Sequence, residues 1–110
     1  QVDRFNLFRI MQEFINNSVK YSQSEHIDVS FSKDETGIVK IVIDDHGVGF
    51  DMNQSKGTLG ISNMMDRIKI ANLEGNIVSE IGRGTILEIY FQSILTRLGH
   101  KFIHHGSYRK

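Results

Sequence analysis

The residues of this chain that could do chemistry fall into four short segments. Residues 13–21 contain a carboxylate, two amides, a lysine and a tyrosine, and residues 45–50 contain a carboxylate and two glycines. Residues 57–60 begin and end with glycine, and residues 82–85 read Gly-Arg-Gly-Thr. Each segment alone also fits a plain structural role, as a solvated helix face, an Asp- and Gly-rich turn or a hairpin turn. Their occurrence together and in this order indicates a shared site.

The first segment has the spacing of a helix face. Glu13, Asn17 and Tyr21 are four residues apart, so on a helix they lie one turn apart on one side, with Lys20 beside them. A carboxamide oxygen is a hard ligand suited to Mg²⁺, and lysine supplies a point charge for phosphate. We interpret this side as the metal- and phosphate-binding part of a site. We expect it to lie opposite an apolar stripe of Met11, Ile15 and Val19.

The second segment follows a β-branched run, residues 38–43, that is suited to a central strand. Asp45 then stands at a strand end, where its carboxylate can accept a hydrogen bond from an exocyclic amine. Gly47 and Gly49 leave room for a ligand against the backbone. They are not a dinucleotide-binding fingerprint, because no third glycine follows at the required spacing and no helix begins there.

The third and fourth segments complete the pocket. Gly57 and Gly60 precede a second helical pattern, and the free N–H groups of a helix N-terminus bind phosphate. Thr85 opens a strand and could place its hydroxyl next to Asp45. Only residues 51–56 separate the second segment from the third, so any lid over the phosphates is short. Together the four segments predict an ATP pocket.

Hydropathy patterns indicate the elements that must position these segments. Apolar residues recur at helical spacing from Asp3, which we expect to be the N-cap, to about Ser22, and again from Leu59 to Ala71, with Gly75 ending the second helix. Alternating or β-branched stretches predict four strands, at residues 27–31, 38–43, 77–81 and 85–91. The order αββαββ predicts an α+β fold, a two-layer α/β sandwich with both helices on one face of a mixed β-sheet.

Composition narrows the class of protein. A chain of 110 residues with 39% hydrophobic content forms one domain with a single core. Thirteen basic and 13 acidic residues give a net charge of zero, so nothing points to nucleic acid or an anionic membrane as a partner. The absence of cysteine excludes disulfides and thiolate metal sites. We place the domain in residues 1–92 and a basic C-terminal tail, with a helical turn at 94–98, in residues 93–110.

At these residues the chain resembles a known family. From about Arg4 to Phe91 it is similar to the ATP-binding catalytic domain of sensor histidine kinases, in the nitrate-sensor-like subgroup of the gyrase, Hsp90, histidine kinase and MutL superfamily. Residues 8–22 resemble the N box, 45–49 the G1 box, 57–67 the G2 region and 82–85 the last glycine box. The resemblance implies a Bergerat-type ATP-binding fold.

The resemblance also implies a role for each residue of the phosphate side. Asn17 would coordinate Mg²⁺, and Glu13 would sit beside it as the acidic residue that orients water or metal. Lys20 would contact phosphate. These three residues would form the catalytic group, acting on ATP through positioning and charge neutralisation.

On the adenine side, the resemblance implies that Asp45 accepts a hydrogen bond from the adenine amino group, with Thr85 helping through a water. Tyr21 stands where this subgroup more often has histidine, and it could stack on adenine. The residues that would shape the pocket and its lid are Gly47, Gly49, Gly57 and Gly60. The last two are three residues apart instead of the usual two, so the chain departs from the family pattern at Gly57.

The activity that the resemblance implies needs a phosphoacceptor histidine on a dimerisation segment. The positions of His26, His46 and His100 are unlike that of an acceptor, and the chain has no initiator Met. We therefore expect a piece of a longer protein that binds Mg-ATP but does not phosphorylate itself. The implied partners are the phosphoacceptor domain of the parent kinase and a response regulator. The parent would be a homodimer with this domain in the cytoplasm, and any membrane attachment would lie in other segments.

Two other functions share such a pocket. An ATP-driven clamp of the gyrase, Hsp90 or MutL type has a longer lid and an added transducer domain, so the short lid here argues against it. A nucleotide-binding regulatory module, or a serine kinase of the anti-sigma type, is the second alternative. Glu13, Asn17 and Asp45 are all present, which argues against a degenerate kinase but not against a serine kinase.

Overall fold

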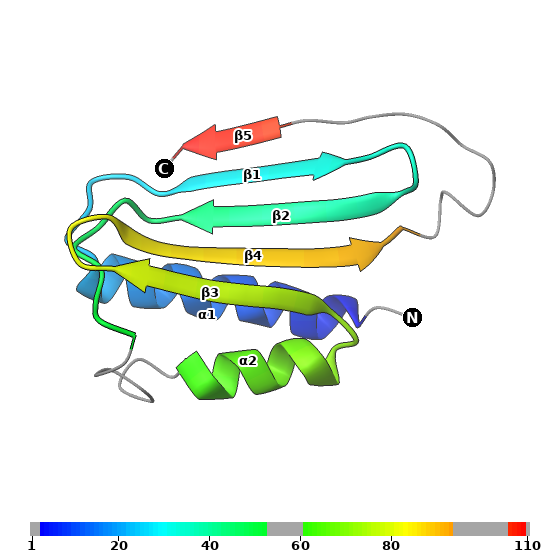
Figure 1. Ribbon diagram of the computed structural model, residues 1–110, viewed down its shortest axis with the longest axis horizontal. Coiled ribbons are helices and arrows are strands. Elements are labelled where there is room, and N and C mark those ends of the chain that lie inside the picture. Colours follow the sequence, from blue (N-terminus) through cyan, green and yellow to red (C-terminus); the bar gives the residue numbers. More distant parts are fainter. Residues whose placement is uncertain (1–2, 53–60, 94–105, 110) are drawn as a thin grey trace.

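The computed structural model describes residues 3–52, 61–93 and 106–109. Two layers make up the fold, a β-sheet and a pair of helices that both lie on one face of it (Figure 1). The α+β class and the placement of the helices are as predicted from the sequence. In chain order the elements are α1 (Arg4–Tyr21), β1 (Asp28–Lys33), β2 (Ile38–Asp44), α2 (Ile61–Ile70), β3 (Glu74–Glu80), β4 (Gly84–Gln92) and β5 (Gly106–Arg109).

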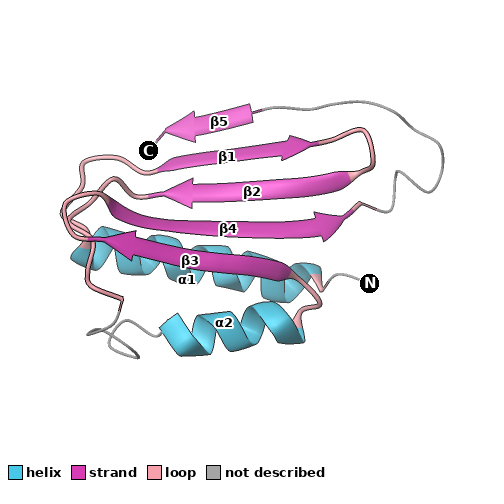
Figure 2. Ribbon diagram, in the orientation of Figure 1, coloured by secondary structure: helices cyan, strands magenta, loops and turns pink. Residues whose placement is uncertain are grey.

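The strand order in the sheet is β3-β4-β2-β1-β5, and every neighbouring pair is antiparallel (Figure 2). From the order αββαββ we expected a mixed sheet. Strands β2 and β3 do run in the same direction, but β4 lies between them. The inserted strand leaves no parallel neighbours within the described sheet, so the expectation of a mixed sheet was wrong.

The core lies between the sheet and the helices. The central strands β2 and β4 contribute Ile43, Leu87 and Ile89, each fully buried, and α2 contributes Met64 and Ile68. The pairing of Ile41 with Ile89 and of Ile43 with Leu87 sets these side chains side by side. Full burial of one such side chain contributes roughly 1.5–3 kcal/mol, so the two central strands and α2 supply much of the stability.

The most deeply buried side of helix α1 is offset from the stripe we predicted, although Met11 and Ile15 of that stripe are half-buried and pack against the core. Its buried residues are Ile10, Phe14 and Ser18. The predicted stripe was that of Met11, Ile15 and Val19, yet Val19 is 56% exposed. Phe5 and Phe8 are exposed as well. The helix carries apolar residues around much of its circumference, so spacing alone could not identify the buried face.

The helix ends are capped by side-chain and backbone hydrogen bonds. Asp3 caps α1 as predicted, because its carboxylate accepts a hydrogen bond of 3.1 Å from the backbone N–H of Asn6. Helix α2 ends at Ile70, and Asn72, two residues later, has a left-handed φ of 61°. The N–H of Leu73 then bonds back to the carbonyl of Ile68 at 3.0 Å, and that of Asn72 to Lys69 at 3.1 Å. This pair of bonds is a Schellman motif.

We expected Gly75 to end α2, but it lies within β3. A β-carbon at this position would come within 2.7 Å of the carbonyl oxygen of Glu88 and within 3.3 Å of the Ile68 side chain. Gly75 therefore lets α2 approach the sheet closely. The left-handed position after α2 is taken by Asn72, because asparagine tolerates this conformation.

Part of the predicted tail belongs to the sheet. Residues 106–109 form β5 and pair with β1, from Asp28↔Arg109 to Phe31↔Gly106. The helical turn expected at residues 94–98 lies outside the described residues. Neither α1 nor α2, the helices of the described part of the chain, is long and apolar enough to cross a membrane.

Candidate functional site

A cavity of about 230 Å³ opens where the C-terminal end of α1, the loop after β2, the start of α2 and the start of β4 meet. Its wall is largely apolar with a few polar groups, the usual composition of a small-molecule site. The residues that line it are Phe14, Asn17, Ser18, Tyr21, Ser22, Asp45, Val48, Gly49, Phe50, Ile61, Met64 and Thr85.

Among the described residues, Asp45 is the only carboxylate on this wall, and it is 3% exposed. It follows directly after β2. Its Oδ1 accepts backbone N–H bonds from Gly47 at 2.8 Å and from Thr85 at 2.9 Å, and its Oδ2 accepts the hydroxyl of Ser18 at 3.0 Å. Burying a carboxylate is costly unless it is hydrogen-bonded. The three donors come from three elements. A carboxylate offers about four acceptor directions, so one on Oδ2 is not filled by any residue that the structure describes.

Thr85 reaches Asp45 differently from our expectation. We predicted that its hydroxyl would lie next to the carboxylate, but the contact is made by its backbone N–H. The hydroxyl instead lies 2.7 Å from the hydroxyl of Ser79, which also accepts the N–H of Phe50 at 2.9 Å. Ser79 thereby connects the β3–β4 turn to the loop after β2. Thr85 still lines the cavity.

Glycine is required where this loop and the β3–β4 turn touch. Gly49 has a φ of 65°, and a β-carbon there would collide with the carbonyl group of Glu80. Gly84 has a φ of 97°, and a β-carbon there would lie 2.7 Å from Oδ1 of Asp45. The close approach of these two backbones is what brings the Thr85 N–H to the carboxylate.

The loop is also joined to the end of α1. The N–H of Val48 donates to the carbonyl of Ser22 at 2.8 Å, and the carbonyl of Val48 accepts the N–H of Gly82 at 2.8 Å. Gly47 packs so tightly against Ser22 that any β-carbon would overlap it. The segment that carries Asp45 is thus fixed on both sides.

The structure brings together some of the predicted site residues and separates others. Asn17, Tyr21, Asp45, Gly49 and Thr85 line the cavity. Gly47 is not among the lining residues and instead supports the loop by packing against Ser22. Glu13 and Lys20 are not among the lining residues: Lys20 is exposed, and Oε2 of Glu13 accepts a 2.8 Å bond from Arg67 of α2. Gly57 and Gly60 lie outside the described residues.

The sequence analysis did not predict that Ser18 and Gly84 lie next to Asp45. Ser18 was not among the predicted site residues, although a small polar residue one turn after the buried Phe14 is a recognisable exception on an apolar helix face. Gly84 was noted only as part of a glycine segment. Its effect depends on the approach of two loops that are distant in the sequence.

Comparisons with known proteins agree with this geometry. The model of the histidine kinase-, DNA gyrase B-, and HSP90-like ATPase family matches residues 2–102. The oxygen sensor histidine kinase NreB of Staphylococcus carnosus (strain TM300) is 39% identical over 85 residues, which cover 76% of this chain and 24% of NreB. The signal transduction histidine-protein kinase/phosphatase DegS of Bacillus subtilis (strain 168) is 33% identical over 87 residues, covering 76% of this chain and 22% of DegS. The chain thus spans under a quarter of the length of these relatives.

A solved structure shares the fold. The histidine kinase domain of the blue-light activated histidine kinase from Erythrobacter litoralis EL346 superimposes with a TM-score of 0.64 at 17% identity, over 79% of this chain and 43% of that chain. The family match over residues 2–102 supports an ATP-binding domain. The chain belongs to the histidine kinase-, DNA gyrase B-, and HSP90-like ATPase family, and the relatives named above are sensor or signal transduction histidine kinases.

Proposed function

We propose that the chain is the ATP-binding catalytic domain of a two-component sensor histidine kinase. In this proposal it binds Mg-ATP and presents the γ-phosphoryl group to a histidine on a dimerisation segment outside these 110 residues. The observation that carries the proposal is Asp45, a buried carboxylate that lines the cavity and has one acceptor direction that no described residue fills. Family membership and the kinase relatives support it.

Asp45 accounts for a preference for adenine over guanine. The exocyclic amine of adenine is a donor, whereas guanine carries an acceptor oxygen at the equivalent position. A carboxylate accepts from the first and repels the second. Phe14, Ile61 and Met64 give the cavity apolar walls for the base, and Tyr21, which also lines it, would stack on the base. Thr85 contributes through a bridging water.

Asn17 is the proposed Mg²⁺ ligand. It lies on the cavity wall, and its carboxamide oxygen is the kind of hard donor that Mg²⁺ accepts. When bound, Mg²⁺ neutralises phosphate charge. Lys20, one turn beyond Asn16 near the end of the same helix, supplies a positive charge for the phosphates. Gly57 and Gly60, by the family resemblance, would help to shape the pocket and its lid.

Glu13 lies one turn before Asn17 on α1. Its contact with Arg67 fixes its side chain and ties α1 to α2. We propose that Glu13 orients the water or metal next to Asn17 from this fixed position, with Arg67 as the residue that positions it.

The proposed partners follow from the proposed histidine kinase function. The phosphoacceptor domain of the parent kinase would receive the phosphoryl group, and a response regulator would take it further. The parent would be a homodimer, with this domain in the cytoplasm. NreB and DegS, as histidine kinases, support this context.

A transfer assay tests the proposal. The chain is incubated with Mg-ATP and a purified dimerisation segment of its parent kinase, and the acid-labile phosphohistidine product is measured. Phosphohistidine on the added segment supports the proposal. Phosphoserine would favour a serine kinase of the anti-sigma type, and slow hydrolysis without transfer would favour a clamp or regulatory module.

A further inference from the structure

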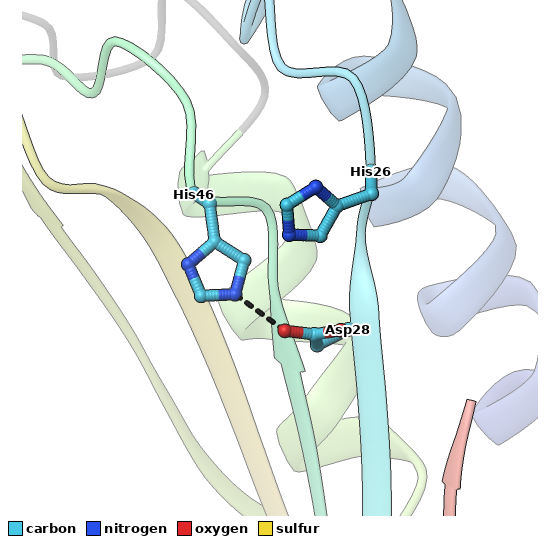
Figure 3. Close-up of side chains that lie close together, drawn as sticks. All are labelled: His26, Asp28 and His46. Carbon is cyan, nitrogen blue, oxygen red and sulfur yellow. Dashed lines mark hydrogen bonds and ion pairs between the residues drawn. The ribbon is translucent and has the colours of Figure 1, made fainter. Parts of the chain in front are cut away.

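Three side chains that no part of the nucleotide site uses converge at one end of the β1–β2 hairpin (Figure 3). His26 lies just before β1, Asp28 begins β1, and His46 lies just after β2. Their potential ligand atoms all lie within 4.8 Å of one another. Nε2 of His46 is 2.6 Å from Oδ2 of Asp28, and the two imidazole rings are 5.1 Å apart between centroids.

The charges at this end of the hairpin favour a cation. Asp28 and Asp44 are directly opposite each other in the β1–β2 register, and facing like charges on neighbouring strands repel. His46 lies between them: Nε2 contacts Asp28, and Nδ1 is 3.6 Å from Oδ1 of Asp44. Two carboxylates therefore converge on a single imidazole, where a positive charge would relieve their repulsion.

The backbone holds both histidines in place. His46 has a left-handed φ of 52°, and its N–H donates to Oδ1 of Asp44 at 3.0 Å. The N–H and carbonyl of His26 both bond to the hydroxyl of Ser24, at 3.3 and 2.8 Å. Backbone positions held in this way limit the rearrangement that binding of an ion would require.

We propose that His26, Asp28 and His46 form a site for a divalent transition metal ion of the zinc class. Two imidazole nitrogens and one carboxylate oxygen are donors that Zn²⁺ accepts, whereas Mg²⁺ and Ca²⁺ prefer oxygen alone. Bonds of about 2.0–2.2 Å around a tetrahedral ion separate its ligand atoms by roughly 3.4 Å. The atoms here are already close enough for small side-chain rotations to reach that spacing.

Zn²⁺ on Nε2 of His46 would replace the hydrogen bond between that nitrogen and Oδ2 of Asp28. A metal-bound neutral imidazole carries its one proton on the other nitrogen, so Nδ1 of His46 would face Asp44 as a donor. A carboxylate behind a metal-bound histidine is the usual outer-shell arrangement, and it fixes the tautomer. The side chain of His46 is 40% exposed, so the ion has a route in, and water can fill the fourth position.

The plain alternative is a histidine–aspartate ion pair that needs no metal, and direct metal titration separates the two. The 110-residue chain, freed of metal with a chelator, is titrated with Zn²⁺ by calorimetry and with Co²⁺ by absorption spectroscopy. No nucleotide is present, so the result does not depend on the kinase function. We expect one ion per chain and a Co²⁺ spectrum typical of four ligands.

The variants are chosen to preserve the backbone. His46→Asn keeps a residue that tolerates the left-handed conformation, and His26→Gln is the second ligand variant. Loss of an outer-shell partner alone costs about 10- to 100-fold in affinity, so each ligand variant should lose about 100-fold or more. Asp44→Asn, which keeps the acceptor for the His46 N–H, should lose roughly 10-fold.

Two controls cover binding elsewhere. The double variant His104→Gln/His105→Gln removes the adjacent tail histidines, and Glu35→Gln removes an exposed acid at the other end of the hairpin. Both should bind like the wild type. Thermal unfolding without metal checks that every variant is folded. Absence of Zn²⁺ uptake by the folded wild type, or uptake that survives in His46→Asn and disappears in the tail variant, would overturn the proposal.

Discussion

Ser18 on α1 donates a hydrogen bond of 3.0 Å to Oδ2 of Asp45, 27 residues later in the chain. Both residues are buried, at 5% and 3% exposure. This bond joins the helix that carries the proposed metal ligand to the strand end that carries the proposed adenine acceptor. The face with which α1 packs on the sheet is therefore also the face that builds the cavity, so the fold and the site depend on the same contact.

The first prediction concerns that contact. Ser18→Ala removes one of three donors to a buried carboxylate, and a hydrogen bond to a charged group contributes about 1.5–3 kcal/mol. We expect the free energy of unfolding, measured with urea, to fall by that amount. The neighbouring Val19 is 56% exposed, and Val19→Ser should change stability by less than about 0.5 kcal/mol. Equal losses in the two variants would contradict the assignment of the buried face.

The second prediction separates adenine recognition from folding. Asp45→Asn keeps an acceptor oxygen for the Gly47 and Thr85 N–H groups, and Ser18 can turn its hydroxyl to accept from the new amide. We expect the variant to fold but to lose its response to ATP. At a concentration of 100 times Kd, ATP should stabilise the wild type by about 2.7 kcal/mol.

A thermal shift with ADP, ATP and GTP, with and without Mg²⁺, measures this response. GTP should not stabilise the wild type, and Glu35→Gln, a change in an exposed turn, should behave like the wild type. An Asp45→Asn variant that still responds to ATP would contradict the role of Asp45 in reading adenine.

Much of the fold could be predicted because its signals are local. The β-branched run before Asp45 marks a central strand, and helical spacing marks both helices. The buried face of α1 could not be predicted, since apolar residues on both sides of the helix satisfy the same spacing. The sheet was predicted as mixed because the insertion of β4 between β2 and β3 leaves no trace in the order of elements.

The candidate site also has parts that could be predicted from the sequence and parts that could not. Asp45 and the glycines after it were identified because chemistry and spacing coincide within a few residues. The Glu13–Arg67 pair, separated by 54 positions, and the Ser18–Asp45 bond arise only when α1 packs against its neighbours. The cluster of His26, Asp28 and His46 depends on the register of the β1–β2 hairpin, which could not be predicted from the sequence.

The third prediction is a pH dependence at the β1–β2 turn. Bonds from the Thr36 hydroxyl at 2.7 Å and then from the Ile38 N–H at 2.9 Å hold the pKa of Asp34 below its ordinary value of 3.8. A folded-state pKa that is depressed contributes stability above the unfolded pKa, and this stability is lost as pH falls through the folded pKa.

Asp34→Asn keeps the acceptor oxygen and removes only the charge. The wild type should therefore be more stable than Asp34→Asn at about pH 5, and the difference should shrink towards about pH 3. Urea midpoints at a series of pH values measure it. A difference that stays constant over this range would show that the turn does not favour the ionised carboxylate.

The fourth prediction tests Asn17 as the Mg²⁺ ligand. Asn17→Ala removes a carboxamide from the cavity wall without touching Asp45, so the base should still bind. We expect ADP without Mg²⁺ to stabilise the variant and the wild type equally, and the additional stabilisation that Mg²⁺ brings to disappear in the variant. Asn16→Ala, at the exposed neighbouring position, is the matched control and should keep the full Mg²⁺ effect. A Mg²⁺ effect that is unchanged in Asn17→Ala would show that Asn17 is not the Mg²⁺ ligand, and Glu13 would be the next residue to test. A loss of the Mg²⁺-free response as well would mean that Asn17 supports the cavity and does not act on the metal alone.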